Sequence, residues 1–336
     1  MLTIEMILMT VAAAGVLSVL GIAFGLLLLG IDRRVSARMQ ARIGPPLSQP
    51  YIDLKKLLSK ENIIPENAVA SIFNAAPIIA LASSLIVLLY LPIGSMMPVL
   101  GGYGDLILVM YLLAVPALAM VAGGFASGSP YATIGAQREM VSMIAYELPL
   151  ASIVIAVAWL LYSSGITDPF ALSSVVANPV WTLVGPLGMV GLFVLLLTFA
   201  WVSPAELSKI PFDTPEAETE LAGGILVEYS GKNLGLFTVA QGVKTLVMGG
   251  LAVAIFFPWN ISPLLGLTSY AAMAVDAVFF FLKVIVLMIL SVTIIRTGLA
   301  RFRITHVVTL FWVYLGLAGL FGLSLVILDS VLMGGF

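Results

Sequence analysis

Long runs without charge constrain the fold of this chain more than any other feature. Residues 6–31 (MILMTVAAAGVLSVLGIAFGLLLLGI) contain no acidic or basic residue. As a helix rising about 1.5 Å per residue, such a run can cross the roughly 30 Å of hydrocarbon in a bilayer. Of the 336 residues, 61% are hydrophobic and only 10% are charged, outside the range of soluble globular proteins. We expect an all-α, multi-pass protein of the cell membrane, plasma or inner, whose first run is a retained helix rather than a signal peptide.

Eight candidate transmembrane spans are separated by glycine, proline and polar residues. They lie near residues 4–30, 71–92, 104–125, 141–162, 186–203, 234–257, 269–295 and 306–330. Thirteen of the fifteen Lys and Arg residues fall between spans 1 and 2, 3 and 4, 5 and 6, or 7 and 8. The positive-inside rule then predicts that these loops face the cytoplasm and that both termini lie outside.

The two longest connections, residues 31–70 and 204–233, both belong to the predicted inside face. We interpret the chain as a single membrane domain, 1–336, whose long inside loops form a docking surface for a cytoplasmic partner. The alternative is that their charges only retain the loops on the inner side.

The chain has few ligands for a redox centre, because it contains no cysteine and a single histidine, His306. Thiolate-held iron–sulfur clusters, disulfides and a bis-histidine haem are impossible from this chain alone. We therefore expect no metal site and no redox centre on the chain itself.

Four ionisable residues lie well inside predicted spans, away from the residues that end them: Glu147, Lys244, Asp276 and Lys283. A charge near the bilayer centre costs at least about 2.5–3.5 kcal/mol, so each should face protein or water and have a partner. Asp276 and Lys283 share one helix face, and static pairing is one explanation. Four such groups in one small bundle favour a polar pathway.

The most acidic segment is KIPFDTPEAETELAGGILVEYSG, residues 209–231, with carboxylates at Asp213, Glu216, Glu218, Glu220 and Glu228. Asp213 and Glu216 have the spacing of an N-cap and its capping-box partner. That explanation leaves Glu218, Glu220 and Glu228 without a structural reason.

Like charges on one helix face disfavour the helix, as Glu216 and Glu220 would if the segment were helical. Repelling carboxylates at an apolar boundary raise one another's pKa, which allows proton exchange near neutral pH. Gly223 and Gly224 follow, and we interpret them as a flexible hinge next to the titratable groups.

Residues 212–231 closely resemble the signature of the membrane component of complex I that roofs the quinone chamber, usually called subunit 1. Three more blocks resemble the same family in order and spacing. They are DRRVSARMQARIGP at 32–45, FASGSPYATIGAQREMVSMIAYELPL at 125–150 and RTGLARFRI at 296–304. Eight spans with both termini outside are also the family's arrangement.

The resemblance implies that the chain anchors a peripheral arm of iron–sulfur and catalytic subunits. It also implies neighbouring antiporter-like and small membrane subunits, with membrane lipid but no nucleic acid as a further partner. Electron transfer in the arm would be coupled to proton or sodium translocation. The coupling residues that the resemblance implies are Glu147, Glu216, Glu218, Glu220, Glu228 and Asp105. To these we add Asp213 of the acidic segment and the charges inside the spans, Lys244, Asp276 and Lys283. The resemblance also implies that the quinone cavity or the arm interface is lined by Arg33, Arg34, Arg38 and Arg42, and we expect the other inside arginines, Arg138, Arg296, Arg301 and Arg303, on the same surface.

Three positions depart from the usual family pattern: Asp32 replaces a glutamate, Gln241 stands where quinone-reducing relatives carry a glutamate, and Thr305 lies near their aspartate. The family includes subunits of membrane-bound nickel-iron hydrogenases, of ferredoxin- or F(420)-dependent dehydrogenases and of sulfur-reducing complexes. Residues 135–150 are more similar to those relatives. Two expectations stay open, a chain that binds no cofactor and a quinone in a cavity shared with partner subunits.

Two other classes of function stay open as well. A stand-alone secondary transporter would bind its substrate at the buried charges, but such proteins usually carry internal repeats with broken helices, and none is evident here. A purely structural anchor would tolerate neutralisation of the acids.

Overall fold

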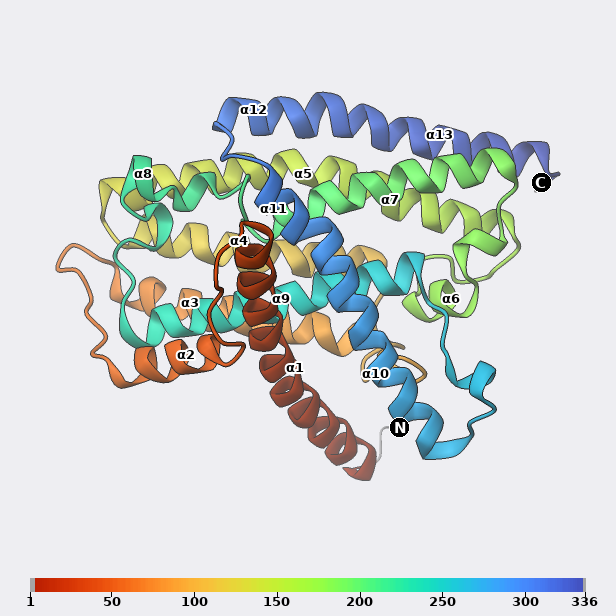
Figure 1. Cartoon of the computed structure of the whole chain (residues 1–336), viewed down its shortest axis with the longest axis horizontal. Helices are drawn as coiled ribbons and strands as arrows, with labels where there is room; N and C mark the ends of the chain where they lie inside the picture. Colours follow the sequence, from red (N-terminus) through yellow and green to blue (C-terminus); the bar gives the residue numbers. More distant parts are fainter. Residues whose placement is uncertain (1–3, 335–336) are drawn as a thin grey trace.

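The computed structural model describes residues 4–334, which form a bundle of long helices (Figure 1). Eight helical segments are long and apolar enough to cross a membrane, which confirms the predicted number. They are α1 (Ile4–Met39), α3 (Ala70–Tyr90), α4 (Leu106–Ala126), α5 (Pro130–Ser163), α7 (Pro186–Glu206), α9 (Gly231–Phe256), α10 (Ser269–Met288) continued by α11 (Ile294–Gly298), and α12 (Ile304–Thr309) continued by α13 (Gly316–Leu332).

Two of the spans are interrupted by π-helical turns, Ile289–Thr293 between α10 and α11 and Leu310–Leu315 between α12 and α13. The short helices α2 (Gln49–Ser59), α6 (Leu172–Ala177) and α8 (Glu218–Leu221) lie in the connections. In Figure 1, α2, α8 and the start of α12 occupy one end of the bundle, and α6 occupies the other.

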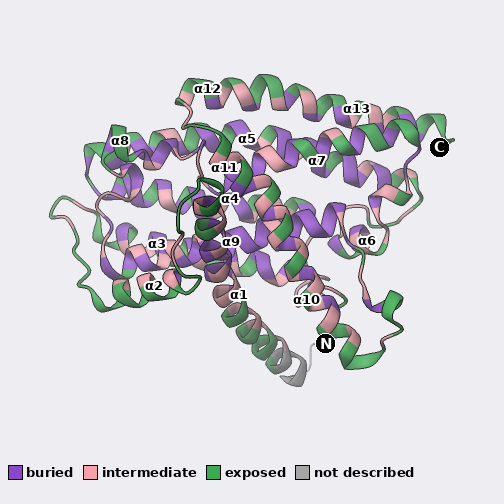
Figure 2. Ribbon diagram, in the orientation of Figure 1, coloured by how far each residue is buried: buried purple, intermediate pink, exposed green. Residues whose placement is uncertain are grey.

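Helix α9 is the centre of the bundle. In its apolar stretch 94% of residues are buried, against 28% in the spans formed by α10–α11 and by α12–α13 (Figure 2). Its glycines allow this position: a Cβ on Gly25 of α1 would lie 2.5 Å from the backbone carbon of Gly242. Small residues bring helix backbones together in membranes, where lipid supplies no hydrophobic drive for association.

Two predicted boundaries were wrong. Helix α5 begins at Pro130 rather than near residue 141, so Arg138 lies on a helix and not in a loop between spans. Helix α1 continues to Met39 and carries Arg33, Arg34 and Arg38 on its last turns. At about 1.5 Å per residue, the 34 residues of α5 exceed the hydrocarbon thickness, so charged residues near its start need not enter the membrane.

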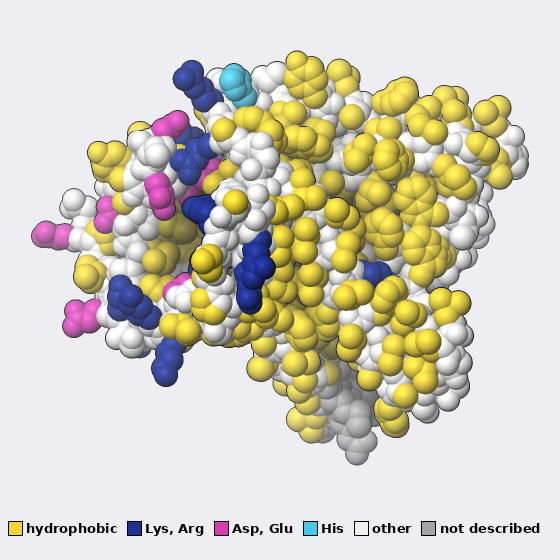
Figure 3. Space-filling view, viewed as in Figure 1, with side chains coloured by type: hydrophobic (Ala, Val, Ile, Leu, Met, Phe, Trp, Pro, Cys, Tyr) yellow, Lys and Arg dark blue, Asp and Glu magenta, His cyan; other side chains and the backbone are white. Residues whose placement is uncertain are grey.

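Charge gathers at the end of the molecule that carries α2, α8 and the start of α12, and most of the remaining visible face is hydrophobic (Figure 3). This separation agrees with the grouping of basic residues along the sequence. The side of the membrane that each end faces stays a prediction.

Candidate functional site: a buried polar cavity below an acidic loop

A small cavity lies where α5, α7 and α9 meet the loop after α7. Its free volume is about 50 Å³, which is enough for a few water molecules, since one needs roughly 10–15 Å³ by this measure. Its polar lining consists of Glu139, Glu206, Ser208, Glu216, Thr238, Gln241 and Lys244. These residues are far apart in the sequence, so predicting the set requires knowing how the helices pack.

Lys244 and Glu206 form a buried ion pair at the cavity wall. The Lys244 Nζ lies 2.7 Å from Glu206 Oε1, and the two side chains are 8% and 2% exposed. Glu206 is the last residue of α7, and Lys244 lies midway along α9. The cost of a charge inside the bundle is thus offset by a partner on another helix.

A second carboxylate, Glu139 of α5, is buried and also lines the cavity. The Ser208 hydroxyl lies 3.5 Å from both of its oxygens. The buried Tyr146 hydroxyl lies beside Glu206. Around the cavity itself, two carboxylates, one ammonium and the Ser208 hydroxyl are a set of groups that water molecules can connect.

Glu216 links this cavity to the acidic loop. It is partly buried and lines the cavity. Burial raises the pKa of Glu216 above its ordinary value, although the neighbouring Lys209 opposes the shift. Burial likewise lowers the pKa of the Lys209 ammonium. Both shifts favour the neutral forms of these two groups.

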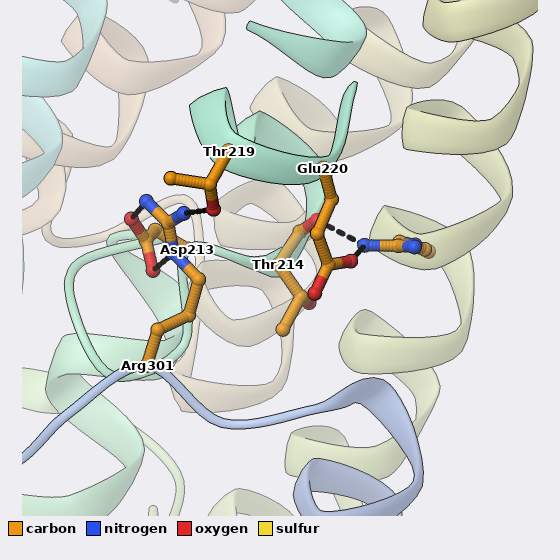
Figure 4. A network of polar contacts seen from close by, with 6 residues as sticks. Asp213, Thr214, Thr219, Glu220 and Arg301 are labelled. Atoms are coloured by element: carbon orange, nitrogen blue, oxygen red, sulfur yellow. Dashed lines mark hydrogen bonds and ion pairs between the residues drawn. The ribbon is translucent and has the colours of Figure 1, made fainter. Parts of the chain in front are cut away.

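The loop itself is fastened by two ion pairs (Figure 4). Arg301 donates from Nε to Asp213 Oδ1 at 2.8 Å and from Nη2 to Oδ2 at 2.5 Å, and its other nitrogen donates to the Thr219 hydroxyl. These hydrogen bonds to Asp213 raise the pKa of Arg301. Arg138 of α5 lies 2.6 Å from Glu220 and also donates to the Thr214 carbonyl.

These contacts correct two predictions. A helical turn does begin at Thr214, but the Asp213 side chain makes no capping hydrogen bond because Arg301 holds both of its oxygens. Glu216 and Glu220 do not repel on a shared helix, since α8 begins only at Glu218 and Glu220 is neutralised by Arg138.

The prediction of a loose hinge was wrong for Gly224. Its φ is +55°, and a Cβ there would lie 1.8 Å from the carbonyl oxygen of Pro215. Gly135 of α5 makes a similar approach, with a Cβ position 2.5 Å from the Ile225 nitrogen. Only glycine fits at these two backbone contacts, which hold the loop tightly against α5.

The end of the acidic segment is anchored by Tyr229. Its ring stacks on Phe73 of α3 with centroids 4.1 Å apart, and its hydroxyl donates to the Phe73 carbonyl at 3.1 Å. Glu228 is partly buried and Glu218 is exposed, and neither lines the cavity.

Three predicted coupling residues lie away from the cavity and have other contacts. Asp105 caps α4 by accepting the backbone N–H of Leu108 at 2.8 Å. Asp276 accepts from the nitrogen and the hydroxyl of Ser262. Lys283 donates to the carbonyls of Phe257 and Trp259, just beyond the end of α9. Asp276 and Lys283 thus do not neutralise each other directly.

Glu147 does not line the cavity but lies close to it. It is partly buried on α5, one residue after Tyr146, and is close enough to Glu206 to interact electrostatically.

The predicted arginine surface divides into two sets. Arg33 pairs with Asp53 at 2.9 Å, and Arg296 pairs with the buried Asp32, which also accepts from the Thr293 hydroxyl at 2.8 Å. The arginines with no acidic partner among the described residues are exposed, and they are Arg34, Arg38, Arg42 and Arg303.

Sequence reasoning missed Glu139 and Glu206. Both had been assigned to inside loops because the predicted spans ended at residue 203 and began at residue 141. The available signal was Lys244: a lysine inside a span needs an acidic partner, and Glu206 directly follows the apolar run of span 5.

Comparison with known proteins shows the family to which the chain belongs. The family described as NADH dehydrogenase matches residues 11–327. The chain belongs to this family. Its members include complex I subunit 1, as the sequence resemblance implied.

Individual relatives come from several kinds of complex. Hydrogenase-4 component C of Escherichia coli is 34% identical over 293 residues, covering 87% of this chain and 88% of that protein. An NADH-quinone oxidoreductase subunit of Syntrophobacter fumaroxidans is 30% identical over 308 residues, covering 85% of each. A chain of the membrane-bound sulfane sulfur reductase, an archaeal respiratory membrane complex, superposes with a TM-score of 0.81 at 28% identity. That match covers 94% of this chain and 99% of the other. The chain is therefore a multi-pass membrane protein of the complex I-related superfamily.

Proposed function

We propose that this chain is the ion-coupling subunit of a complex I-related redox complex. Electron transfer would take place in a peripheral iron–sulfur arm, and this chain would link it to proton or sodium translocation. The observation that carries the proposal is the buried Lys244–Glu206 pair next to a second carboxylate, Glu139, around a water-sized cavity. Buried ionisable groups in membrane proteins mark ion and proton pathways.

The pathway would begin at Glu216, the residue shared by the acidic loop and the cavity. A change of charge above the loop would shift the protonation of Glu216. A proton could then pass through cavity water to Glu139. Lys244 interacts electrostatically with both Glu139 and Glu206, so protonation of Glu139 would strengthen its pairing with Glu206.

Glu147 would receive the signal next. It lies along α5 from Glu139, its charge is close to that of Glu206, and it is not enclosed by this chain. An antiporter-like neighbour packed against α5 would be the recipient. Asp105, Asp276 and Lys283 have no place in this route, because each has a structural partner away from the cavity.

The loop at 212–231 would supply the surface for the arm. Arg138 and Arg301 hold it from α5 and from the segment before α12, so a force on the loop reaches both elements. Exposed Arg34, Arg38 and Arg303 would add positive charge to the same surface.

Within the family, we group this chain with the relatives whose complexes reduce no quinone. Gln241 lines the cavity as a neutral amide and donates to the Leu207 carbonyl at 3.2 Å. This is the position at which the resemblance implies a carboxylate in quinone-reducing members.

The test is a Glu139→Gln variant of the assembled complex in vesicles. Electron transfer should persist while ion translocation is lost, because glutamine has nearly the same shape but cannot titrate. Glu218→Gln is the matched control, since that residue is exposed and does not line the cavity. Normal translocation in the Glu139 variant would refute the coupling role. Purification as a lone chain, without iron–sulfur subunits, would instead support a secondary transporter.

A further inference from the structure

A second polar cavity lies on the surface between α1, the turn after it and α11. Its volume is about 350 Å³, larger than the cavity at Glu139. Arginine side chains reach it from three separate places: Arg33 on α1, Arg42 in the turn and Arg296 on α11. We call these three residues, with Ser36 and Ile43, the arginine pocket.

The arginine pocket carries positive charge that the chain compensates only in part. Asp53 holds Arg33 and Asp32 holds Arg296, whereas Arg42 donates to the neutral side-chain oxygen of Gln40. A guanidinium has five N–H donors, so even the paired arginines keep donors for another anion. The ion pairs also fix two of the three groups in position, which reduces the entropy lost when a ligand binds.

The turn that lines the arginine pocket packs closely against α1. The chain turns back on α1 at Gly44, where a Cβ would lie 2.9 Å from the Arg34 Cα. The pocket is therefore formed in the chain as folded and does not require a loop to close over it.

Apolar side chains surround this cluster of charge. Ile43 forms part of the lining and is fully exposed. Met39 on α1, and Leu290 and Ile294 on the turns before Arg296, are also exposed. All belong to the ends of membrane-spanning segments or to the turn that follows one of them. Cations beside exposed apolar residues at a membrane boundary match a phospholipid, whose phosphate lies next to its glycerol and acyl chains.

We propose that the arginine pocket binds the phosphate of an anionic phospholipid in the leaflet on the side of the inner loops. This goes beyond the coupling role, because it uses none of the cavity carboxylates. It also assigns Arg33, Arg42 and Arg296 to lipid, leaving Arg34 and Arg38 for contact with the arm.

The test is lipid retention by the purified complex. The complex is washed free of lipid in detergent and mixed with phosphatidylglycerol or phosphatidylcholine, and bound lipid is counted by native mass spectrometry. The informative variant is Arg42→Gln, because within residues 4–334 Arg42 has no carboxylate partner to leave unpaired. Lys60→Gln is its control, with the same loss of charge on an exposed basic residue outside the pocket.

We expect phosphatidylglycerol to be retained in preference to phosphatidylcholine. Retention should fall about fivefold in Arg42→Gln, the ratio for roughly 1 kcal/mol per basic residue near an anionic surface, and stay unchanged in Lys60→Gln. Equal losses in the two variants would overturn the proposal, because they would indicate diffuse surface charge. Photocrosslinking from position 43 to a protein subunit instead of a lipid would overturn it as well.

Discussion

Replacement of Lys244 by methionine would leave Glu206 buried without its partner. The two side chains are 8% and 2% exposed and their charged atoms lie 2.7 Å apart, so little water is available to replace the lost ammonium. Breaking a buried pair from one side costs about 3–5 kcal/mol, because an uncompensated charge remains. At roughly 2–4 °C per kcal/mol, the unfolding midpoint should fall by on the order of 10 °C.

The second substitution makes this prediction specific. In Lys244→Met/Glu206→Leu the unpaired Glu206 carboxylate is removed as well, and the midpoint should recover toward that of the parent, since replacing a buried pair by apolar residues is often nearly neutral. The assay is thermal unfolding of the purified complex, with Lys232→Met as the control because Lys232 is an exposed lysine at the start of the same helix. A double variant no more stable than Lys244→Met would contradict the reasoning.

Three further predictions concern the loop and the far end of the bundle. Burial raises the pKa of Glu216, so the folded protein favours the protonated form of this carboxyl group. The ionised carboxylate therefore destabilises the fold increasingly as the pH rises from the ordinary pKa of a glutamate, about 4.3, through the raised pKa. Glu216→Gln should therefore match the parent in acid and have the higher unfolding midpoint above that window; equal midpoints at all pH values would count against it. Gly224→Ala should cost more than about 1 kcal/mol in thermal unfolding, because its Cβ would meet a backbone carbonyl at 1.8 Å, whereas Gly298→Ala, with nothing within 4 Å, should not. Asp329→Ala should cost about 1–2 kcal/mol, since the buried Asp329 carboxylate accepts the backbone N–H at the start of α7 at 2.6 Å; an unchanged midpoint would show that this cap is dispensable.

Hydropathy predicted the number of spans, because crossing hydrocarbon imposes a length and a composition that are visible in the sequence. It did not predict where α5 begins or where α7 ends. Glu139 and Glu206 were taken for loop residues, although they belong to helices that continue past the apolar stretch. A hydropathy boundary marks the change in solvent, and the helix does not have to stop there.

The acidic loop shows a second limit. Its carboxylates were correctly singled out as unusual, but their partners lie far away in the sequence: Arg301 for Asp213 and Arg138 for Glu220. The same pairing problem hid the Lys244–Glu206 bridge, and it hid Ser262 as the hydrogen-bond partner of Asp276. Which charge meets which depends on helix packing, and helix packing depends on close contacts such as that between Gly25 and Gly242.

Glu139 is central to the proposed coupling role, which requires its protonation to change when the redox arm turns over. Redox-induced infrared difference spectroscopy of the intact complex measures this directly, through the carbonyl band of a protonated carboxyl group. We predict a carboxyl signal on reduction that disappears in Glu139→Gln and persists in Glu218→Gln. An unchanged difference spectrum in Glu139→Gln would contradict the coupling role.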